Sequence, residues 1–134
     1  MPVKNYSARL LALMLILFSC RSGNNQNILD VNAFKARMEQ QPQAVVVDVR
    51  TADEFSDGHL PGALNIDVKN PSFGSQVHEL DTAKTIMLYC HSGGRSRKAA
   101  EIMEGLGFRK VMVMKGGFLD WQHAGFPVEK DGTH

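Results

Sequence analysis

Cys90 and the six residues after it are the part of this sequence best suited to covalent chemistry, because they join a thiol to a polar, glycine-containing loop. The apolar run of residues 85–89 predicts a strand that ends at Cys90, and a helical pattern begins near Ser96. In open α/β sheets, ligands bind at the carboxyl ends of the strands. Cys90 is therefore predicted to be a nucleophile, the alternative being a small buried residue at a strand end.

The loop after Cys90 is predicted to favour the anionic form of the sulfur. Two adjacent glycines allow positive φ angles, so successive backbone N–H groups can turn toward the sulfur as an anion-binding nest. The positive end of the following helix acts on the same point. We therefore expect a thiol pKa below about 8.5. The loop residues that form this candidate binding site are His91, Ser92, Gly93, Gly94, Arg95 and Ser96.

Arg95 has two possible roles in this loop. It could orient an anionic substrate, or it could pair with a carboxylate and brace the loop. Asp48 and Glu54 follow another predicted strand and are expected nearby, so the bracing role is favoured. Asp48 is likewise interpreted as scaffold.

An alternation of strands and helices must position these residues. Apolar runs predict strands at residues 44–49, 63–66, 85–89 and 111–114. Helical patterns lie between and around them, at residues 31–41, 52–57, 73–80, 96–106 and 118–123, with Asp30 and Thr51 as predicted N-caps. This order predicts an α/β fold in three layers, with a mainly parallel sheet and helices on both faces.

Several short motifs, in this order, resemble those of a single-domain rhodanese over about residues 30–130. They are Asp48-Val49-Arg50, Glu54-Phe55, Gly58-His59-Leu60-Pro61-Gly62-Ala63-Leu64-Asn65-Ile66, Tyr89-Cys90-His91-Ser92-Gly93-Gly94-Arg95-Ser96 and Gly116-Gly117-Phe118-Leu119-Asp120-Trp121. The resemblance implies a rhodanese-like fold with a sheet of about five strands.

The same resemblance implies a sulfurtransferase of the thiosulfate type. Cys90 would take sulfur from a small-molecule donor, hold it as a persulfide and pass it to a thiol or cyanide-like acceptor, without a cofactor or metal. Asp48, Arg50, Glu54 and His59 would support the site. His91 stands where many active relatives carry Arg or Lys, and its partial charge at neutral pH weakens the expectation of rapid thiosulfate turnover.

Two other functions stay open at this point. One is a persulfide carrier without turnover, or a protein-binding rhodanese module. The other, less favoured, is a phosphatase or arsenate reductase; the related phosphatases use a Cys-x5-Arg loop, whereas Cys90 and Arg95 are separated by four residues. A tighter loop suits a sulfur atom better than a tetrahedral group.

The remaining histidines, aromatic residues and methionines are interpreted as structural. His59 is expected to be a hydrogen-bonded residue of a turn, and the other histidines show no metal-binding spacing. Phe118 and Trp121 are assigned to the core, as are the methionines of the apolar runs.

The N-terminal residues predict an export signal. Residues 1–19 hold two basic residues and no acid, and their apolar run of nine residues is too short to span a bilayer. Leu17-Phe18-Ser19-Cys20 resembles the lipobox of bacterial lipoproteins, which implies cleavage before Cys20 and lipidation of its thiol. The alternatives are an ordinary secretory peptide and an uncleaved anchor. We expect an exported lipoprotein that is anchored to a membrane and faces the periplasm or the cell surface.

Length and charge set the remaining expectations. The predicted parts are a signal peptide at 1–19, the lipidated residue and a flexible tether at 20–28, one domain at 29–130 and a tail at 131–134. With 134 residues and two cysteines, the chain is too short for a large multidomain enzyme and too poor in cysteine for a disulfide scaffold. Its balanced charge gives no sign of a nucleic-acid partner, and a monomer is expected.

Overall fold

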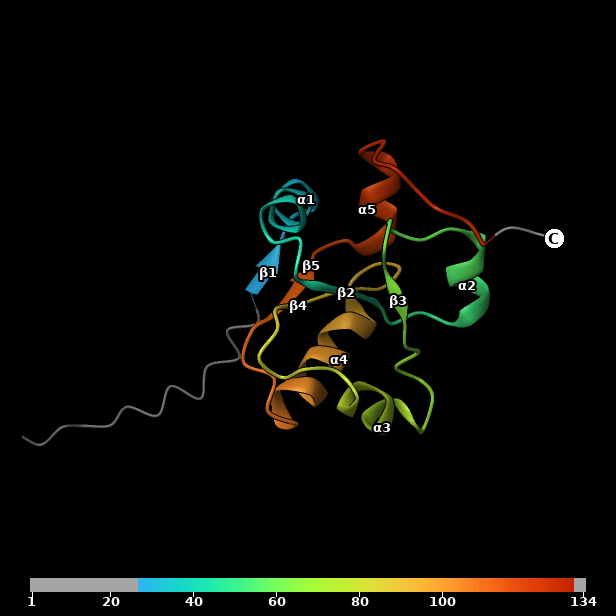
Figure 1. Ribbon diagram of the computed structural model, residues 1–134. Coiled ribbons are helices and arrows are strands. Elements are labelled where there is room, and N and C mark those ends of the chain that lie inside the picture. The colour runs from blue at the N-terminus through green and yellow to red at the C-terminus, as the bar shows by residue number, and fades with distance from the viewer. Residues whose placement is uncertain (1–26, 132–134) are drawn as a thin grey trace, which may run out of the picture.

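A five-stranded parallel sheet forms the centre of the computed structural model, which describes residues 27–131 (Figure 1). The strands lie in the order β1-β5-β4-β2-β3, which puts β4 in the middle of the sheet. Their bounds are β1 Asn27–Leu29, β2 Val45–Asp48, β3 Leu64–Asn65, β4 Ile86–Tyr89 and β5 Val111–Met114. The α/β fold with a parallel sheet of five strands is therefore confirmed.

Five helices alternate with these strands along the described residues. They are α1 Val31–Gln40, α2 Ala52–Asp57, α3 Phe73–His78, α4 Gly94–Gly105 and α5 Gly117–His123. Local signals explain where the first two begin. The Asp30 carboxylate accepts a hydrogen bond from the Ala33 N–H at 2.8 Å, and Thr51 forms a reciprocal capping box with Glu54.

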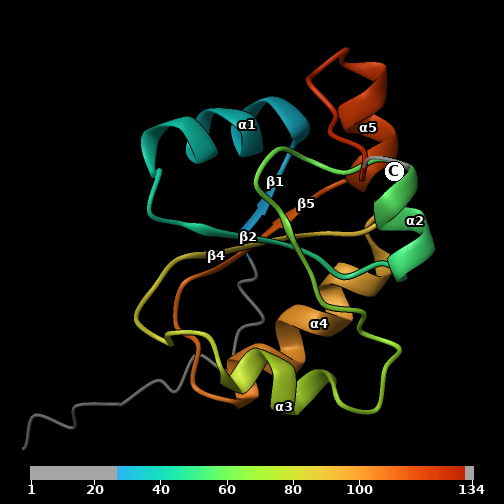
Figure 2. The same cartoon turned by 45° about the vertical axis from the view of Figure 1, so that its right-hand side comes forward.

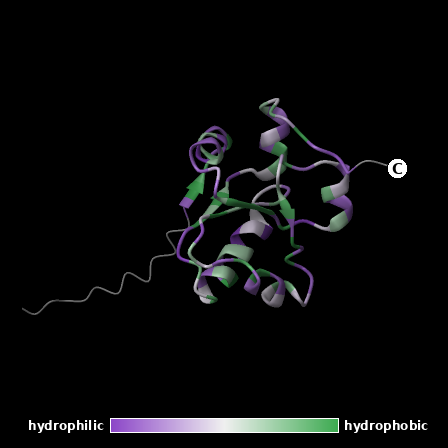
Figure 3. Ribbon diagram, in the orientation of Figure 1, coloured by the Kyte–Doolittle hydropathy of each residue, from purple (hydrophilic) through white to green (hydrophobic). Residues whose placement is uncertain are grey.

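Each face of the sheet carries its own buried cluster. Because successive side chains of a strand point to opposite faces, Val47 and Leu88 pack toward α3 and α4, whereas Val46 and Met87 pack toward α1 and α5. Figure 2 shows these two pairs of helices on opposite sides of the sheet. Burial on both faces explains why the strands read as continuous apolar runs, which Figure 3 shows at the centre of the molecule.

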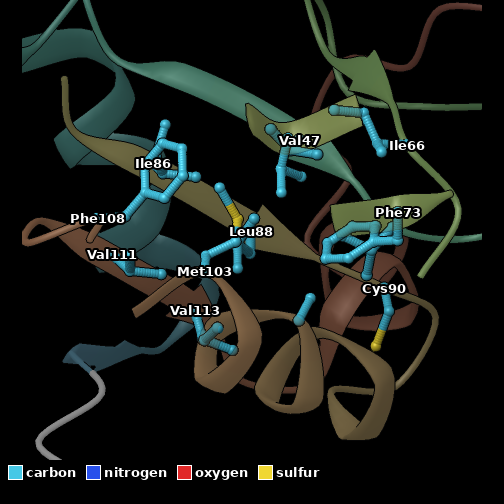
Figure 4. Close-up of a cluster of buried hydrophobic side chains, with 14 residues drawn as sticks. Val47, Ile66, Phe73, Ile86, Leu88, Cys90, Met103, Phe108, Val111 and Val113 are labelled. Carbon is cyan, nitrogen blue, oxygen red and sulfur yellow. The ribbon is translucent and has the colours of Figure 1, made fainter. Parts of the chain in front are cut away.

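The predicted core residues are buried in these clusters. Phe118 and Trp121 lie with α1 residues on one face, and the methionines of the apolar runs, Met87, Met103, Met112 and Met114, are all buried. Figure 4 shows the other cluster, with Cys90 at one end of it. All of these elements lie within residues 27–131, so this part of the chain builds its own core.

Two sequence interpretations are corrected. Asn27 and Ile28 were assigned to the tether, but they pair in parallel with Met112 and Val113 of β5 as part of β1. A three-residue edge strand with exposed residues lacks the apolar run by which a central strand is detected. Helix α4 begins at Gly94, two residues before the predicted start.

The predicted signal peptide, Cys20 and the rest of the tether lie outside the described residues, as do residues 132–134. Within residues 27–131, no helix is long and apolar enough to cross a bilayer.

Candidate active site

Cys90 lies where the carboxyl ends of the three central strands meet. It directly follows β4, between the segments that leave β2 and β5. The Val49 N–H donates to the Tyr89 carbonyl at 3.1 Å, while the Phe118 N–H donates to the Cys90 carbonyl at 2.8 Å and the Leu119 N–H to the His91 carbonyl at 3.1 Å. The loop is thereby held from both neighbouring strands.

The Cys90 sulfur is enclosed by hydrogen-bond donors. Cys90 is only 1% exposed, and the Gly93 N–H donates to its Sγ at 3.0 Å. The Ser96 hydroxyl lies 3.5 Å from Sγ and 3.0 Å from the Gly93 carbonyl oxygen, so its single proton can be donated to either of these acceptors. Burial raises the pKa of the Cys90 thiol, but hydrogen bonds from the Ser96 side chain and from the backbone N–H groups of Ser96, Gly93 and Ser92 outweigh it, leaving the pKa below its ordinary value.

The two loop glycines have different conformations. Gly93 has φ +113°, which turns the chain toward the sulfur and makes this residue the N-cap of α4. Gly94 has no positive φ and is the first residue of the helix, so the expected positive φ is found only at Gly93. Arg95 and Ser96 consequently belong to the first helical turn, whereas His91 and Ser92 are exposed on the loop.

Arg95 is engaged by Glu54. Two hydrogen bonds of 2.8 Å join its guanidinium to both carboxylate oxygens, and the Thr51 N–H also donates to Glu54 at 3.0 Å. The Arg95 hydrogen bonds, with those from Thr51, hold the pKa of Glu54 far below its usual range despite the opposing effect of burial. The pair therefore ties the capped start of α2 to the first turn of α4, which is the bracing geometry considered for Arg95.

Asp48 pairs with Arg50 instead of Arg95. Arg50 donates to both carboxylate oxygens, with 2.6 Å between Nη2 and Oδ2, and the same Nη2 donates to the Gly58 carbonyl at 2.6 Å. The guanidinium lies 4.3 Å from the centre of the Phe118 ring. Both charged residues are almost fully buried. Through the contacts of Arg50, the pair connects the end of β2 with the turn at Gly58 and with α5.

His59 belongs to a structural contact with Phe55 and Glu129 that does not include the sulfur. Its Nδ1 lies 2.8 Å from the Phe55 carbonyl, its ring stacks on the Phe55 ring at 3.7 Å, and its backbone pairs with Glu129. Next to it, the Tyr89 hydroxyl accepts a hydrogen bond from the Leu60 N–H at 3.0 Å. Burial raises the pKa of Tyr89 well above its ordinary value, so this group stays protonated.

Gly117 is a site residue to which the sequence motifs assigned no role of its own. It has φ +58°, and a Cβ atom added to it would lie 2.4 Å from the Cys90 carbonyl oxygen. Only glycine allows α5 to begin this close to the loop and to direct two N–H donors at its carbonyls. The available signal was a glycine pair that begins two positions after the end of a predicted strand.

The family comparison agrees with this geometry. Residues 30–124 match the model of the rhodanese-like domain. The chain belongs to the rhodanese-like domain family. Its similarity to a rhodanese-like domain from an Anabaena protein, solved in solution, gives a TM-score of 0.71 at 25% identity, covering 79% of this chain and 80% of that one.

Two curated relatives of this rhodanese-like protein carry different functional names. It is 34% identical over 118 residues to thiosulfate sulfurtransferase 18 of Arabidopsis thaliana, covering 79% of this chain and 87% of that one. It is 32% identical over 93 residues to a Bacillus subtilis protein, YrkF, whose name describes it as a sulfur carrier, covering 69% of this chain. The matched region spans about half, 49%, of that second relative.

The hydrogen bonds to Cys90 predict the pH dependence of its alkylation. The rate of reaction with iodoacetamide is expected to rise with pH, with a midpoint below that of the same chain unfolded in urea, where the thiol titrates at about 8.5. Because the folded-state pKa is the lower one, the thiolate stabilises the fold above the unfolded-state pKa, and this contribution is lost as pH falls through the folded-state pKa. The measurement uses residues 21–134, in which Cys90 is the sole cysteine.

Ser96→Ala serves as the control for this profile. It removes the hydroxyl beside Sγ, so its midpoint is expected to lie between those of the folded wild type and the unfolded chain. A folded wild type that titrates at or above the unfolded chain would contradict the role of the loop.

Proposed function

We propose that this protein is a sulfurtransferase that accepts sulfane sulfur from a thiosulfate-type donor and transfers it through a Cys90 persulfide. The observation that carries the proposal is the enclosure of Cys90 Sγ by the Gly93 N–H and the Ser96 hydroxyl at the start of α4. This surrounding lowers the thiol pKa and so increases the fraction of reactive thiolate at a given pH. The named activity of the plant relative supports the same reaction class.

The reaction proceeds by two displacements at sulfur. The Cys90 thiolate attacks the outer sulfur of thiosulfate, forming a new S–S bond as the sulfur–sulfur bond of thiosulfate breaks and its electron pair leaves with sulfite. A nucleophilic acceptor such as cyanide then attacks the terminal sulfur, and the S–S bond electrons return to Cys90 as a thiolate. Donor and acceptor together balance both steps.

The loop also suits the intermediate. A persulfide carries negative charge on its terminal sulfur, and backbone N–H groups that turn inward at the start of a helix stabilise an anion without any rearrangement. Arg95 is bound to Glu54, which leaves the exposed His91 as the side chain on the loop that could attract a dianionic donor. Thiosulfate is therefore expected to be a slower donor than a less highly charged persulfide.

A persulfide carrier without rapid turnover is the second candidate. The engagement of Arg95 by Glu54 and the name of the Bacillus subtilis relative favour it. Both candidates require Cys90 to gain a sulfur atom, so they differ in turnover and not in the intermediate.

The number of turnovers separates the two candidates. Residues 21–134 are mixed with thiosulfate, or with glutathione persulfide, and excess cyanide, and thiocyanate is measured per mole of protein. The proposed enzyme forms many equivalents at a steady rate, whereas a carrier gives a first phase of about one equivalent followed by slow reloading. Intact mass after the donor alone shows whether one sulfur atom has been added; a chain that gains none with either donor contradicts both candidates.

We also propose that the protein is exported as a lipoprotein held to a membrane through Cys20. The supporting observation is the short apolar segment that ends in Leu17-Phe18-Ser19-Cys20. More than one acyl chain on the new N-terminus would give stable anchoring. Labelled fatty acid should enter the full chain in a bacterial host and be absent from Cys20→Ala; equal labelling of both would exclude this anchor.

A further inference from the structure

A hollow of about 670 Å³ lies at the amino ends of the strands, which is the end of the sheet opposite to Cys90. Cys90 follows the carboxyl end of β4, whereas this hollow is lined by Thr85, which precedes the same strand, and by the segments that lead into β2 and β5. Asn27, the first residue of β1, also lines it. The hollow therefore occupies the end of the domain at which the chain from the N-terminus joins it.

Four cationic side chains line this hollow, and no acidic residue does. They come from three separate segments: Arg37 from α1, Lys84 from the turn before β4, and Arg109 and Lys110 from the turn before β5. We call these four residues the basic edge. The nearby Asp81 carboxylate is bound within its own turn by the Ala83 N–H at 2.8 Å.

The side chains of the basic edge have no anionic partner among residues 27–131. The ion pairs of this part of the chain involve other cations, namely Lys35, Arg50, His59 and Arg95. This is unlike the domain as a whole, in which residues 27–131 hold twelve basic and fourteen acidic residues. Unpaired cations gathered around one hollow in a slightly acidic domain indicate a binding surface for an external anion.

We propose that the basic edge docks on the anionic headgroups of the bilayer to which Cys20 is anchored; this rests on the anchor proposed above. Asn27 is seven residues after Cys20, and such a segment spans at most about 25 Å when fully extended. The lipid would thus hold the hollow near the membrane, where anionic headgroups attract lysine and arginine within a Debye length. Docking by this edge directs the Cys90 loop away from the bilayer, toward soluble donors and acceptors.

Binding to vesicles tests the basic edge without the lipid anchor. Residues 21–134 are sedimented with vesicles of phosphatidylglycerol and phosphatidylcholine, or of phosphatidylcholine alone. The wild type is expected to bind only the anionic vesicles and to be released by raised salt. Changing the four residues to Gln (Arg37→Gln, Lys84→Gln, Arg109→Gln, Lys110→Gln) should lower the partition coefficient at least tenfold.

A matched variant controls for net charge. It carries Lys69→Gln, Lys98→Gln, Lys115→Gln and Lys130→Gln, which remove the same charge from exposed positions elsewhere. This variant should lose less than threefold in binding, and the basic-edge variant should keep the unfolding midpoint and the sulfur transfer of the wild type in solution. Equal losses in the two variants, or no binding of the wild type to anionic vesicles, would overturn the proposal.

Free anions provide the other arm of the experiment. Saturable binding of inorganic pyrophosphate by the wild type, without binding to anionic vesicles, would identify a soluble ligand and reject membrane docking. Failure of the Cys20 anchor is seen separately in fatty-acid labelling, and failure of sulfur transfer is seen in thiocyanate formation. The failure of each proposal can thus be distinguished from the failure of the others.

Discussion

Replacing Cys90 by serine is expected to lower kcat/KM for sulfur transfer from thiosulfate to cyanide on the order of a thousandfold or more. The change exchanges one atom, and the Gly93 N–H and Ser96 hydroxyl beside Sγ can hydrogen-bond the new hydroxyl, so the fold should be retained. A serine hydroxyl in the same loop stays protonated at neutral pH and forms no persulfide. Thiocyanate formation under initial-rate conditions measures the effect.

Two further measurements make this result specific to the thiol. The unfolding midpoint of Cys90→Ser should stay within a few degrees of the wild type, and its mass should not change after incubation with thiosulfate. A variant that retains activity within tenfold of the wild type would show that Cys90 is not the nucleophile. The thiocyanate formed in a blank without protein must be subtracted, because cyanide and thiosulfate react slowly by themselves.

Replacing Asp48 by asparagine is expected to lower the free energy of unfolding by about 3–5 kcal/mol, because it leaves the buried guanidinium of Arg50 without its counterion. The side chains of this pair are 0% and 3% exposed, and Arg50 makes its remaining polar contact with the Gly58 carbonyl. Urea unfolding followed by circular dichroism measures the loss. Residual activity per folded molecule should remain, because neither side chain contacts the sulfur.

A comparison with Glu54→Gln tests whether burial of the ion pair causes the large loss of stability expected for Asp48→Asn. The Arg95–Glu54 pair has side chains that are 23% and 34% exposed, so breaking it should cost about 1 kcal/mol or less. Since the pKa of Glu54 is depressed, its contribution is present above the ordinary carboxylate pKa and is lost as the pH falls. The double variant Asp48→Leu, Arg50→Met should recover part of the stability lost by Asp48→Asn. If Asp48→Asn lowers the free energy of unfolding no more than Glu54→Gln does, burial of the Asp48–Arg50 pair does not cause the expected loss of stability.

Local patterns in the sequence are sufficient to predict most of the strands and helices of the fold. The apolar runs of β2, β4 and β5 are long enough to identify, because strands buried on both faces need apolar side chains at every position. The caps at Asp30 and Thr51 are equally local, since each side chain binds an N–H three residues away. The position of Cys90 at the end of a strand follows from the same patterns.

Contacts between distant residues were decided only by the tertiary structure. The sequence left both Asp48 and Glu54 as partners for Arg95, and the choice of Glu54 depends on the fold placing the first turns of α2 and α4 within hydrogen-bond distance. The importance of Gly117 depends on its approach to the Cys90 carbonyl from the start of α5. Strand β1 was missed because its pairing with β5 joins residues more than eighty positions apart.

The two ends of the sheet differ in the same way, because one site is predicted by the sequence and the other is formed only by the tertiary structure. The loop at Cys90 is continuous in sequence, so its residue types and spacing alone determined that this protein has a candidate nucleophile in an anion-binding loop. The basic edge is assembled from α1 and from the turns before β4 and β5, which have no common motif. In a parallel sheet, the segments that precede the strands lie at one end of the strands and the segments that follow them lie at the other. The order of the strands then decides which of these segments become neighbours.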